Sequence, residues 1–300
     1  MLHLVYSPHY LDYSFGPHHP FWPERAQLFL AKLSRSSLSY QLHRPKKASD
    51  ADILLVHHPD YLAHLKTLAR QHGFLSPDTP VTPRLLEAAY YSVGGSILAA
   101  RLALQHREAI NLLGGLHHAG IRTSSGFCLF NDHAIAIRQL QKQGKIKKAL
   151  VFDLDVHAGQ GTQEIFYHDP TVFTVSLHQD PTTLYPGTGF PHQIGAGRGR
   201  GYNRNIVLPP GTTEKAYLQA LDSVLPLYRT FQPDLVCLVL GVDTYKKDPL
   251  AQFQLEKSTY FKIGQRFASF PHLAVFFAGG YSKDTPDLWF EFLKGLAQAQ

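Results

Sequence analysis

The sequence predicts an α/β fold in which one central, mostly parallel sheet is covered by helices on both faces. The first observation is a set of short, continuous apolar runs, including residues 149–152 (ALVF), 235–240 (LVCLVL) and 273–277 (LAVFF). Strands buried on both faces lack the polar and apolar alternation of a half-exposed strand. The second observation is that segments with helical spacing of apolar residues separate these runs, as crossovers between parallel strands require.

Length and composition favour one domain over residues 1–300. The chain has 300 residues, of which 44% are hydrophobic, which is enough for one large core. The sequence shows no flexible linker, charge block, internal repeat or low-complexity run that would mark a domain boundary. We therefore expect a single domain.

Composition also excludes several classes of protein. No segment has the roughly 20 uninterrupted apolar residues of a membrane span, and the N-terminus lacks the pattern of a signal peptide. Cys128 and Cys237 lie in apolar surroundings, which favours free thiols in a reducing compartment. We therefore expect a cytoplasmic protein with no membrane partner. The net charge is +6, but the basic residues are scattered without a binding motif, so no specific nucleic-acid partner is expected.

The first elements alternate between strands and helices. Residues 2–6 are predicted as a strand, and a helix follows over residues 23–33, where a proline suits the first helical position. Residues 52–56 (DILLV) are predicted as a second strand and residues 59–70 as a helix. A longer helix is expected over residues 83–105.

The same order continues through the rest of the chain. Asn131 or Asp132 fits the N-cap of a helix whose apolar stripe reaches Leu140. The other predicted elements are strands over residues 109–113, 149–152, 172–177, 205–208, 234–240 and 273–277, and helices over residues 161–167 and 214–231.

Polar side chains alternate directly after the central apolar run, in KKALVFDLDVHAGQG (residues 147–161). In an extended segment Asp153, Asp155 and His157 would share one face. Residues two apart are separated by roughly 6.6 Å, so two neighbours can converge on one metal ion but a third hardly can. Asp155 and His157 are therefore candidate ligands, and Asp153 is placed to orient a histidine from behind. An accidental pattern at a solvated strand end is the alternative.

Three other apolar strands end in glycine followed by a polar group. Asp243 follows residues 234–240, His117 and His118 follow LLGG, and Tyr281 follows FFAGG. Ligands of open α/β sheets bind beyond the carboxyl ends of the strands, so these groups are expected at one edge. Asp243 would complete a three-ligand metal set with an open position, the pattern of a catalytic site. The histidines stand where proton transfer could be done, and Tyr281 is a hydroxyl donor.

These motifs resemble those of the zinc-dependent histone deacetylase family, which has the arginase-deacetylase fold. The resemblance rests on GGLHHAG, SGFCLFND, DLDVHAGQGT, LYPGTG, GVDTYKKDPL and AGGY, in this order, and is greatest to the short bacterial or class IV-like members. It implies a metal-dependent deacylase that hydrolyses the amide of an Nε-acetyl-lysine or a related N-acyl amine. A metal-activated water and a histidine general base would carry out the reaction.

The resemblance also implies roles for individual residues. Asp155, His157 and Asp243 would bind Zn²⁺, although Fe²⁺ is possible with this ligand set. His118 would be the general base and His117 its partner, held by Asp153, while Tyr281 would hydrogen-bond the acyl carbonyl. The acyl channel would be lined by Gly126, Phe127 and Tyr185, and Arg25 would line an internal acetate-release cavity. A structural K⁺ would lie on Asp153, Asp155, His157, Ser176 and Leu177.

The chain departs from the family pattern at three positions. Gln160 stands where many members have Asp and others Asn, beside the second histidine, and a neutral amide would not raise the pKa of His118 as a carboxylate would. Tyr185 replaces a commoner Phe, and Ala158 stands where a further His is frequent. The acyl chain length that the channel accepts therefore stays open.

Several other functions compete with lysine deacetylation. An acetylpolyamine or other small N-acyl amine amidohydrolase and a long-chain lysine deacylase suit the same channel. An arginase-like binuclear hydrolase would need acidic ligands that Ala158 and Gln160 do not supply. A silent acyl-lysine binding protein would not need both His118 and Tyr281. Asp78, in a turn-rich loop, could reach over a substrate or simply be solvated.

Overall fold

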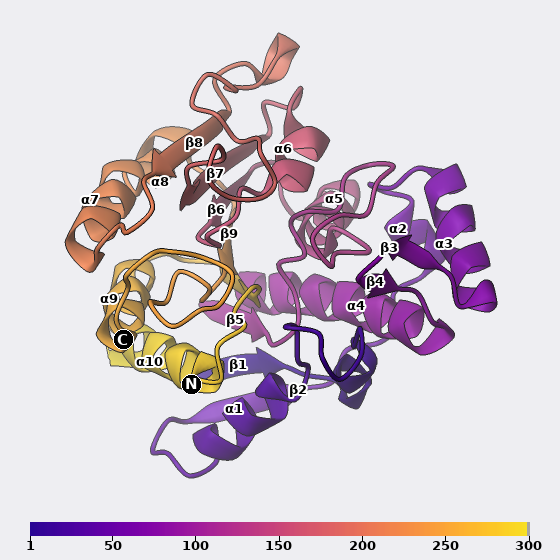
Figure 1. Cartoon of the computed structure of the whole chain (residues 1–300). Helices are drawn as coiled ribbons and strands as arrows, with labels where there is room; N and C mark the ends of the chain where they lie inside the picture. Colours follow the sequence, from indigo (N-terminus) through magenta and orange to yellow (C-terminus); the bar gives the residue numbers. More distant parts are fainter. Residues whose placement is uncertain (299–300) are drawn as a thin grey trace.

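The computed structural model describes residues 1–298, and its centre is an eight-stranded sheet (Figure 1). The strands are β1 (Leu2–Val5), β2 (Tyr40–His43), β5 (Glu108–Asn111), β6 (Ala149–Asp153), β7 (Val172–Gln179), β8 (Asn203–Leu208), β9 (Leu235–Leu240) and β10 (Leu273–Phe277). Their order is β2-β1-β5-β10-β9-β6-β7-β8, and every neighbouring pair is parallel. All their carboxyl ends therefore lie at one edge.

Helices cover both faces of the sheet, as the sequence predicted (Figure 1). One face carries α2 (Asp50–Ile53), α3 (Pro59–Gln71), α4 (Pro83–Gln105), α5 (Asp132–Lys142) and α6 (Gln160–Phe166). The other carries α1 (Arg25–Leu33), α7 (Glu214–Val224), α8 (Leu227–Phe231), α9 (Lys257–Phe267) and α10 (Thr285–Gln298). Two short 3₁₀ helices, η1 (Pro8–Asp12) and η2 (Gly197–Gly199), lie in loops. None of the helices described is both long enough and apolar enough to cross a membrane.

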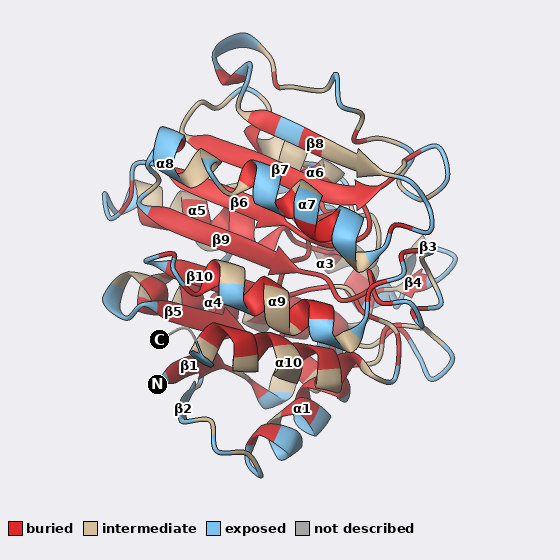
Figure 2. Cartoon of the chain, turned by 90° about the vertical axis from the view of Figure 1, so that its left-hand side faces the viewer, coloured by how far each residue is buried: buried red, intermediate tan, exposed pale blue. Residues whose placement is uncertain are grey.

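The continuous apolar runs are explained by two hydrophobic cores, one on each side of the sheet. In β6 the side chain of Val151 joins the core beneath α4 and α5, whereas Leu150 and Phe152 join the core beneath α9 and α10. Every residue of β6, β9 and β10 is buried (Figure 2). A strand covered on both faces gains from apolar side chains at every position. Cys128 and Cys237 are buried, free thiols, as expected.

Helix starts follow the local signals in the sequence. The Asn131 side chain accepts a hydrogen bond from the Ala134 amide and so caps α5. Thr82 caps α4 in the same way, and Pro83 occupies the first turn, where its missing amide is not needed. The predicted boundaries of α4 are confirmed, and so are those of strand β10.

Three predictions about the elements were wrong or incomplete. Residues 52–56 are not a strand, because Ser49 and Asp52 form a capping box that starts α2. The single helix predicted over residues 214–231 is divided into α7 and α8 at Pro226, which has no amide to continue the helix. The sequence also did not predict β2, α9, α10 or the antiparallel hairpin of β3 (Phe74–Ser76) and β4 (Thr79–Pro80).

Candidate active site

The turn after β6 carries Asp155 and His157, and the loop after β9 carries Asp243. All three side chains are of types that commonly bind metal ions. The predicted extended face shared by Asp153, Asp155 and His157 is wrong, because β6 ends at Asp153 and the Asp155 amide donates back to Asp153 Oδ1 at 3.2 Å. Asp155 and His157 nevertheless lie beside Asp243, which follows β9. One possible ligand atom from each of these three residues lies within 4.8 Å of the others.

The chemistry of these three side chains fits a divalent cation. His157 Nδ1 lies 3.0 Å from Asp155 Oδ1 and 3.2 Å from Asp243 Oδ2, and all three residues are buried. Two buried carboxylates repel each other unless a positive charge lies nearby. Burial and the Asp155 charge raise the pKa of Asp243. Burial alone would raise the pKa of Asp155, but the His117 charge and a hydrogen bond from His157 hold it below its usual range.

Two glycines at strand ends leave the space that the carboxylates occupy. A Cβ atom at Gly241 or at Gly279 would collide with Asp155 Oδ2, and one at Gly279 would also collide with Asp243 Oδ2. The Gly279 amide donates to Asp155 Oδ2 at 3.1 Å, and the Val156 amide donates to Asp243 Oδ1 at 3.0 Å. Backbone amides that follow β6 and β10 thus orient both carboxylates.

The adjacent histidines lie beside this cluster, at the end of β5. His117 Nδ1 lies 2.7 Å from Asp153 Oδ2, and His117 Nε2 lies 3.1 Å from His118 Nε2. His118 Nδ1 lies 2.6 Å from Gln160 Oε1. The loop that carries the histidines is fixed by buried Asp132, which accepts hydrogen bonds from the backbone amides of residues 115 and 116.

The surroundings of the two histidines separate their pKa values. Burial lowers the pKa of His117, but the charges of Asp153 and Asp155 outweigh burial and raise it to about 9. Burial and the neighbouring charges of His117 and His157 hold the pKa of His118 well below its usual value. At neutral pH His118 is therefore uncharged and able to accept a proton.

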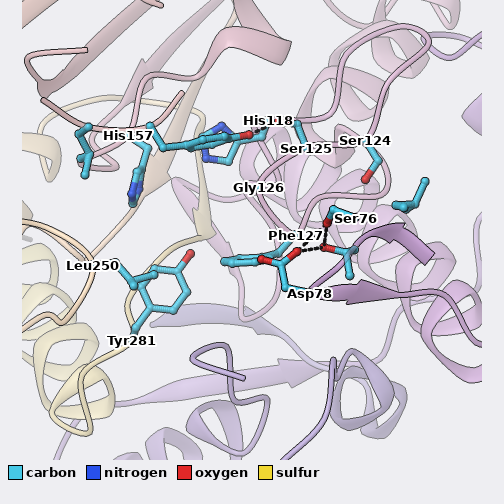
Figure 3. A pocket seen from close by; sticks show the side chains of 14 residues that line it. Ser76, Asp78, His118, Ser124, Ser125, Gly126, Phe127, His157, Leu250 and Tyr281 are labelled. Carbon is cyan, nitrogen blue, oxygen red and sulfur yellow. Dashed lines mark hydrogen bonds between the residues drawn. The ribbon is translucent and has the colours of Figure 1, made fainter. Parts of the chain in front are cut away.

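A cavity of about 460 Å³ reaches these groups from the surface. Figure 3 shows the Tyr281 hydroxyl pointing into the same space as His157 and His118. Burial, with the charges of Asp155 and Asp243, raises the pKa of Tyr281 well above its usual value, so the phenol remains a donor. The cavity is lined by Leu75, Ser76, Asp78, Thr79, His118, Ser124, Ser125, Gly126, Phe127, His157, Leu184, Tyr185, Leu250 and Tyr281.

The residues expected to line a channel do line this cavity. Gly126 has a positive φ of 50°, and a Cβ there would collide with the His118 ring, so only glycine suits the position. The Phe127 ring packs against Tyr281, with ring centroids 6.2 Å apart. Tyr185 is 45% exposed at the rim, and its hydroxyl shares a hydrogen bond with Ser125.

Three further expected residues, Arg25, Ser176 and Leu177, do not line this cavity. Arg25 is buried between the rings of Phe21 and Trp289, and its Nη1 donates to the Gly280 carbonyl at 2.7 Å. Ser176 pairs with Asp153 in the parallel register of β6 and β7, followed by Leu177. Ser176 Oγ lies 2.7 Å from His178 Nδ1.

The sequence left the role of Asp78 open and did not identify Leu250 as part of the site. The β3–β4 hairpin brings Asp78 to the cavity wall, where its carboxylate accepts hydrogen bonds from Ser76 and Thr79. Leu250 forms another part of the wall, and no pattern in the sequence marks it. The turn sequence around Asp78 was the available signal, and only the fold shows that this turn lies over the cavity.

Comparisons with known proteins agree with this geometry. The histone deacetylase domain family matches residues 19–296. A probable deacetylase of Methanothermobacter thermautotrophicus is 38% identical, over 87% of this chain and 80% of the relative. A probable deacetylase of Archaeoglobus fulgidus is 33% identical, over 93% and 81%. The acetoin utilization protein AcuC of Bacillus subtilis is 35% identical, over 86% and 70%.

Solved structures give the same result. The HD domain of HDA15 superposes with a TM-score of 0.89 at 26% identity, covering 98% of this chain and 90% of that chain. An acetylpolyamine aminohydrolase from Burkholderia pseudomallei superposes with a TM-score of 0.88 at 28% identity, covering 100% and 99%. Sequence and structure together show that the chain belongs to the histone deacetylase domain family, whose members here are hydrolases acting on amides.

Proposed function

We propose that this deacetylase-family hydrolase removes the acyl group of Nε-acyl-lysine, with residues 1–300 acting as one catalytic domain. The observation that carries the proposal is the meeting of a buried Asp-His-Asp cluster, an uncharged histidine and a phenol at the base of one cavity. Metal ligands, a base and an oxyanion donor are the parts that amide hydrolysis needs.

Asp155, His157 and Asp243 are the residues that would hold a divalent cation, Zn²⁺ or Fe²⁺. Such a cation supplies Lewis-acid polarisation of the acyl carbonyl and acidifies the attacking water. The surrounding side chains orient the reacting groups, transfer protons and stabilise the developing charge. Asp153 accepts the Nδ1 proton of His117 and so orients that ring toward the reacting atoms.

His118 is the proposed general base. Gln160 Oε1 accepts the His118 Nδ1 proton, so the lone pair of His118 lies on Nε2, 3.1 Å from His117 Nε2, and this atom takes the proton from the attacking water. His117, whose pKa is about 9, keeps its proton at neutral pH and supports proton transfer to the leaving amine. The Tyr281 hydroxyl donates to the acyl oxygen as negative charge develops there.

The cavity lining supports a lysine side chain over a polyamine. Apolar groups of Phe127, Leu184 and Leu250 suit the aliphatic part of an acyl-lysine. Asp78 is the one acidic residue among those that line the cavity in the described chain, and Ser76 and Thr79 already donate to it. A polycation would need more carboxylates than this.

Two other functions are less well supported. An arginase-like reaction needs two metal ions, and residues 1–298 contain one cluster of three ligand side chains, Asp155, His157 and Asp243. A silent binding protein has no use for a base of lowered pKa beside a phenol donor. Acetylpolyamine hydrolysis is the strongest competitor, because a structural neighbour carries that name.

A substrate panel tests the proposal. The protein reconstituted with Zn²⁺ or Fe²⁺ would be assayed with lysine peptides carrying acetyl, butyryl and longer acyl groups, and with acetylated polyamines. We expect the highest kcat/KM on an acyl-lysine peptide and a loss of at least about 100-fold in His118→Ala. A preference for the polyamine would overturn the substrate assignment. Binding of acyl-lysine without turnover would support the silent binding protein.

A further inference from the structure

Two buried charged side chains hold one peptide group from opposite ends, directly before the phenol of the active site. Arg25 Nη1 donates to the Gly280 carbonyl at 2.7 Å, and the Tyr281 amide donates to Asp248 Oδ2 at 2.7 Å. This carbonyl and this amide belong to the same planar unit. A cation at its oxygen and an anion at its nitrogen therefore fix how the unit is rotated. Both Arg25 and Asp248 are buried.

The same carboxylate also connects this peptide to the loop that carries Leu250, which forms a neighbouring part of the cavity wall. Asp248 Oδ2 accepts from the Ser282 amide at 3.3 Å, and Oδ1 accepts from the Leu250 amide at 3.0 Å. Leu250 and Tyr281 lie beside each other in the cavity (Figure 3). Asp248 thus joins the loop after β9 to the loop after β10.

The peptide needs such a restraint because a glycine precedes Tyr281. Gly280 has a φ of 141°, a conformation open to glycine, and it does not restrict its own rotation as other residues do. Rotation of the peptide that follows would swing the Tyr281 Cα–Cβ bond and move the hydroxyl at the far end of the ring. A small misplacement of a reacting group can cost about two orders of magnitude in rate.

We propose that Asp248 is a positioning residue, which fixes the Gly280–Tyr281 peptide opposite Arg25 and thereby aims the Tyr281 hydroxyl at the acyl oxygen. The inference rests on the proposed function of Tyr281 as oxyanion donor. An asparagine has one acceptor oxygen, so its NH₂ group would face a backbone amide on one of the two sides. Burial raises the pKa of Asp248 to about 6, so the carboxylate is ionised in an assay at pH 8.

Asp248→Asn would be measured in the wild type and in a Tyr281→Phe background. We expect it to lower kcat on the order of 10- to 100-fold in the wild type and to cause no further loss of kcat in Tyr281→Phe. Asp248→Asn could also change KM, because Asp248 holds the Leu250 amide and Leu250 lines the cavity. This change in KM would be the same in both backgrounds. Asp284→Asn is the matched control, because Asp284 pairs with Lys257 and Tyr245 rather than with the Tyr281 backbone.

An equal loss of kcat in both backgrounds would show a general structural effect and overturn the proposal. Asp248→Ser, which removes the carboxylate without adding bulk, gives the same test if Asp248→Asn does not fold.

Hydrogen exchange gives a second readout that needs neither metal nor activity. The amides of Tyr281 and Ser282 are expected to exchange at least about tenfold faster in Asp248→Asn and at the wild-type rate in Asp284→Asn. Unchanged exchange in Asp248→Asn contradicts the inference. If Tyr281→Phe keeps full kcat, the proposed role of Tyr281 fails, and exchange still decides whether Asp248 holds the peptide.

Discussion

His117 and His118 are neighbours with identical side chains, yet their partners give them opposite properties. The charges of Asp153 and Asp155 raise the pKa of His117 to about 9, whereas burial and the charges of His117 and His157 lower the pKa of His118, whose partner Gln160 carries no charge to oppose them. Pairs of titratable groups whose environments separate their pKa values commonly divide the acid and base roles of an enzyme. We therefore expect the charge of the residue at position 160 to affect the pH dependence of this site.

Replacing Gln160 with Glu tests this expectation. A carboxylate beside His118 favours the imidazolium form, so the pKa of His118 rises. Because a base must be unprotonated, the acid limb of the kcat/KM profile is expected to move to higher pH. Profiles between pH 5.5 and 9, about the range where histidines titrate, measure this shift. Gln163→Glu adds the same charge beside Asn203 and Asn205 and serves as the control. An acid limb that does not move would mean that His118 is not the base.

Tyr281→Phe removes the proposed oxyanion donor and leaves the ring that packs against Phe127. Loss of one such donor costs about 3 to 4 kcal/mol in comparable sites, so we expect kcat to fall by at least two orders of magnitude. Metal content should not change, because Tyr281 is not in the ligand cluster. A variant with wild-type kcat would exclude Tyr281 from the reaction.

At the scale of elements, the sequence predicted the helices and strands whose local residue pattern matches their burial in the fold. The boundaries of β10 and α4 were predicted correctly, because a continuous apolar run and a Thr-Pro cap identify them. β2 was missed because it is a polar, largely exposed edge strand. The run at residues 52–56 was misassigned because a short apolar segment fits a strand or a helix equally well until its cap is considered.

In the candidate site, too, some residues were predicted from the sequence and others were not. Asp155, His157 and Asp243 follow buried strands, and the gathering of ligands at one sheet edge correctly predicted that they meet, although the extended face assumed for Asp155 and His157 was wrong. Asp248 was not predicted as part of the site, because its partner amide at Tyr281 is 33 residues away and the contact depends on two irregular loops. Contacts of a side chain with distant backbone leave no periodic pattern in a sequence.

The glycine after β10 is an element-scale feature with a measurable effect. Gly279→Ala would place a methyl group against the carboxylates of Asp155 and Asp243, so one of them must move. We expect metal affinity to fall by at least about tenfold, as measured by competition with a chelator, since orienting contacts of this kind are worth 10- to 100-fold. Gly73→Ala, at a position without a positive φ where the added methyl group would meet Leu68, controls for the loss of a glycine away from the carboxylates. Wild-type affinity in Gly279→Ala would contradict this account of the strand end.

At the scale of the whole molecule, a bound metal ion would link the loops that follow two neighbouring strands of the sheet, β6 and β9. The ligands come from the loops after β6 and β9, and β9 separates β6 from β10, which precedes Tyr281. Without a cation the protein buries two carboxylates close together, which opposes folding. A cation that binds only the folded state should therefore increase the free energy of unfolding.

Thermal unfolding with and without metal measures this coupling. Free Zn²⁺ at 100 times its Kd adds about 2.7 kcal/mol, which for a protein of this size corresponds to a rise in Tm of roughly 5 °C. Asp155→Ala and Asp243→Ala should lose this rise, the bound metal in elemental analysis and the activity, because each removes one ligand. Asp60→Ala, at an 81% exposed side chain, should keep all three. Full metal content in Asp243→Ala would place the ion elsewhere, and an unchanged Tm in the wild type would mean that the cation does not link these strands.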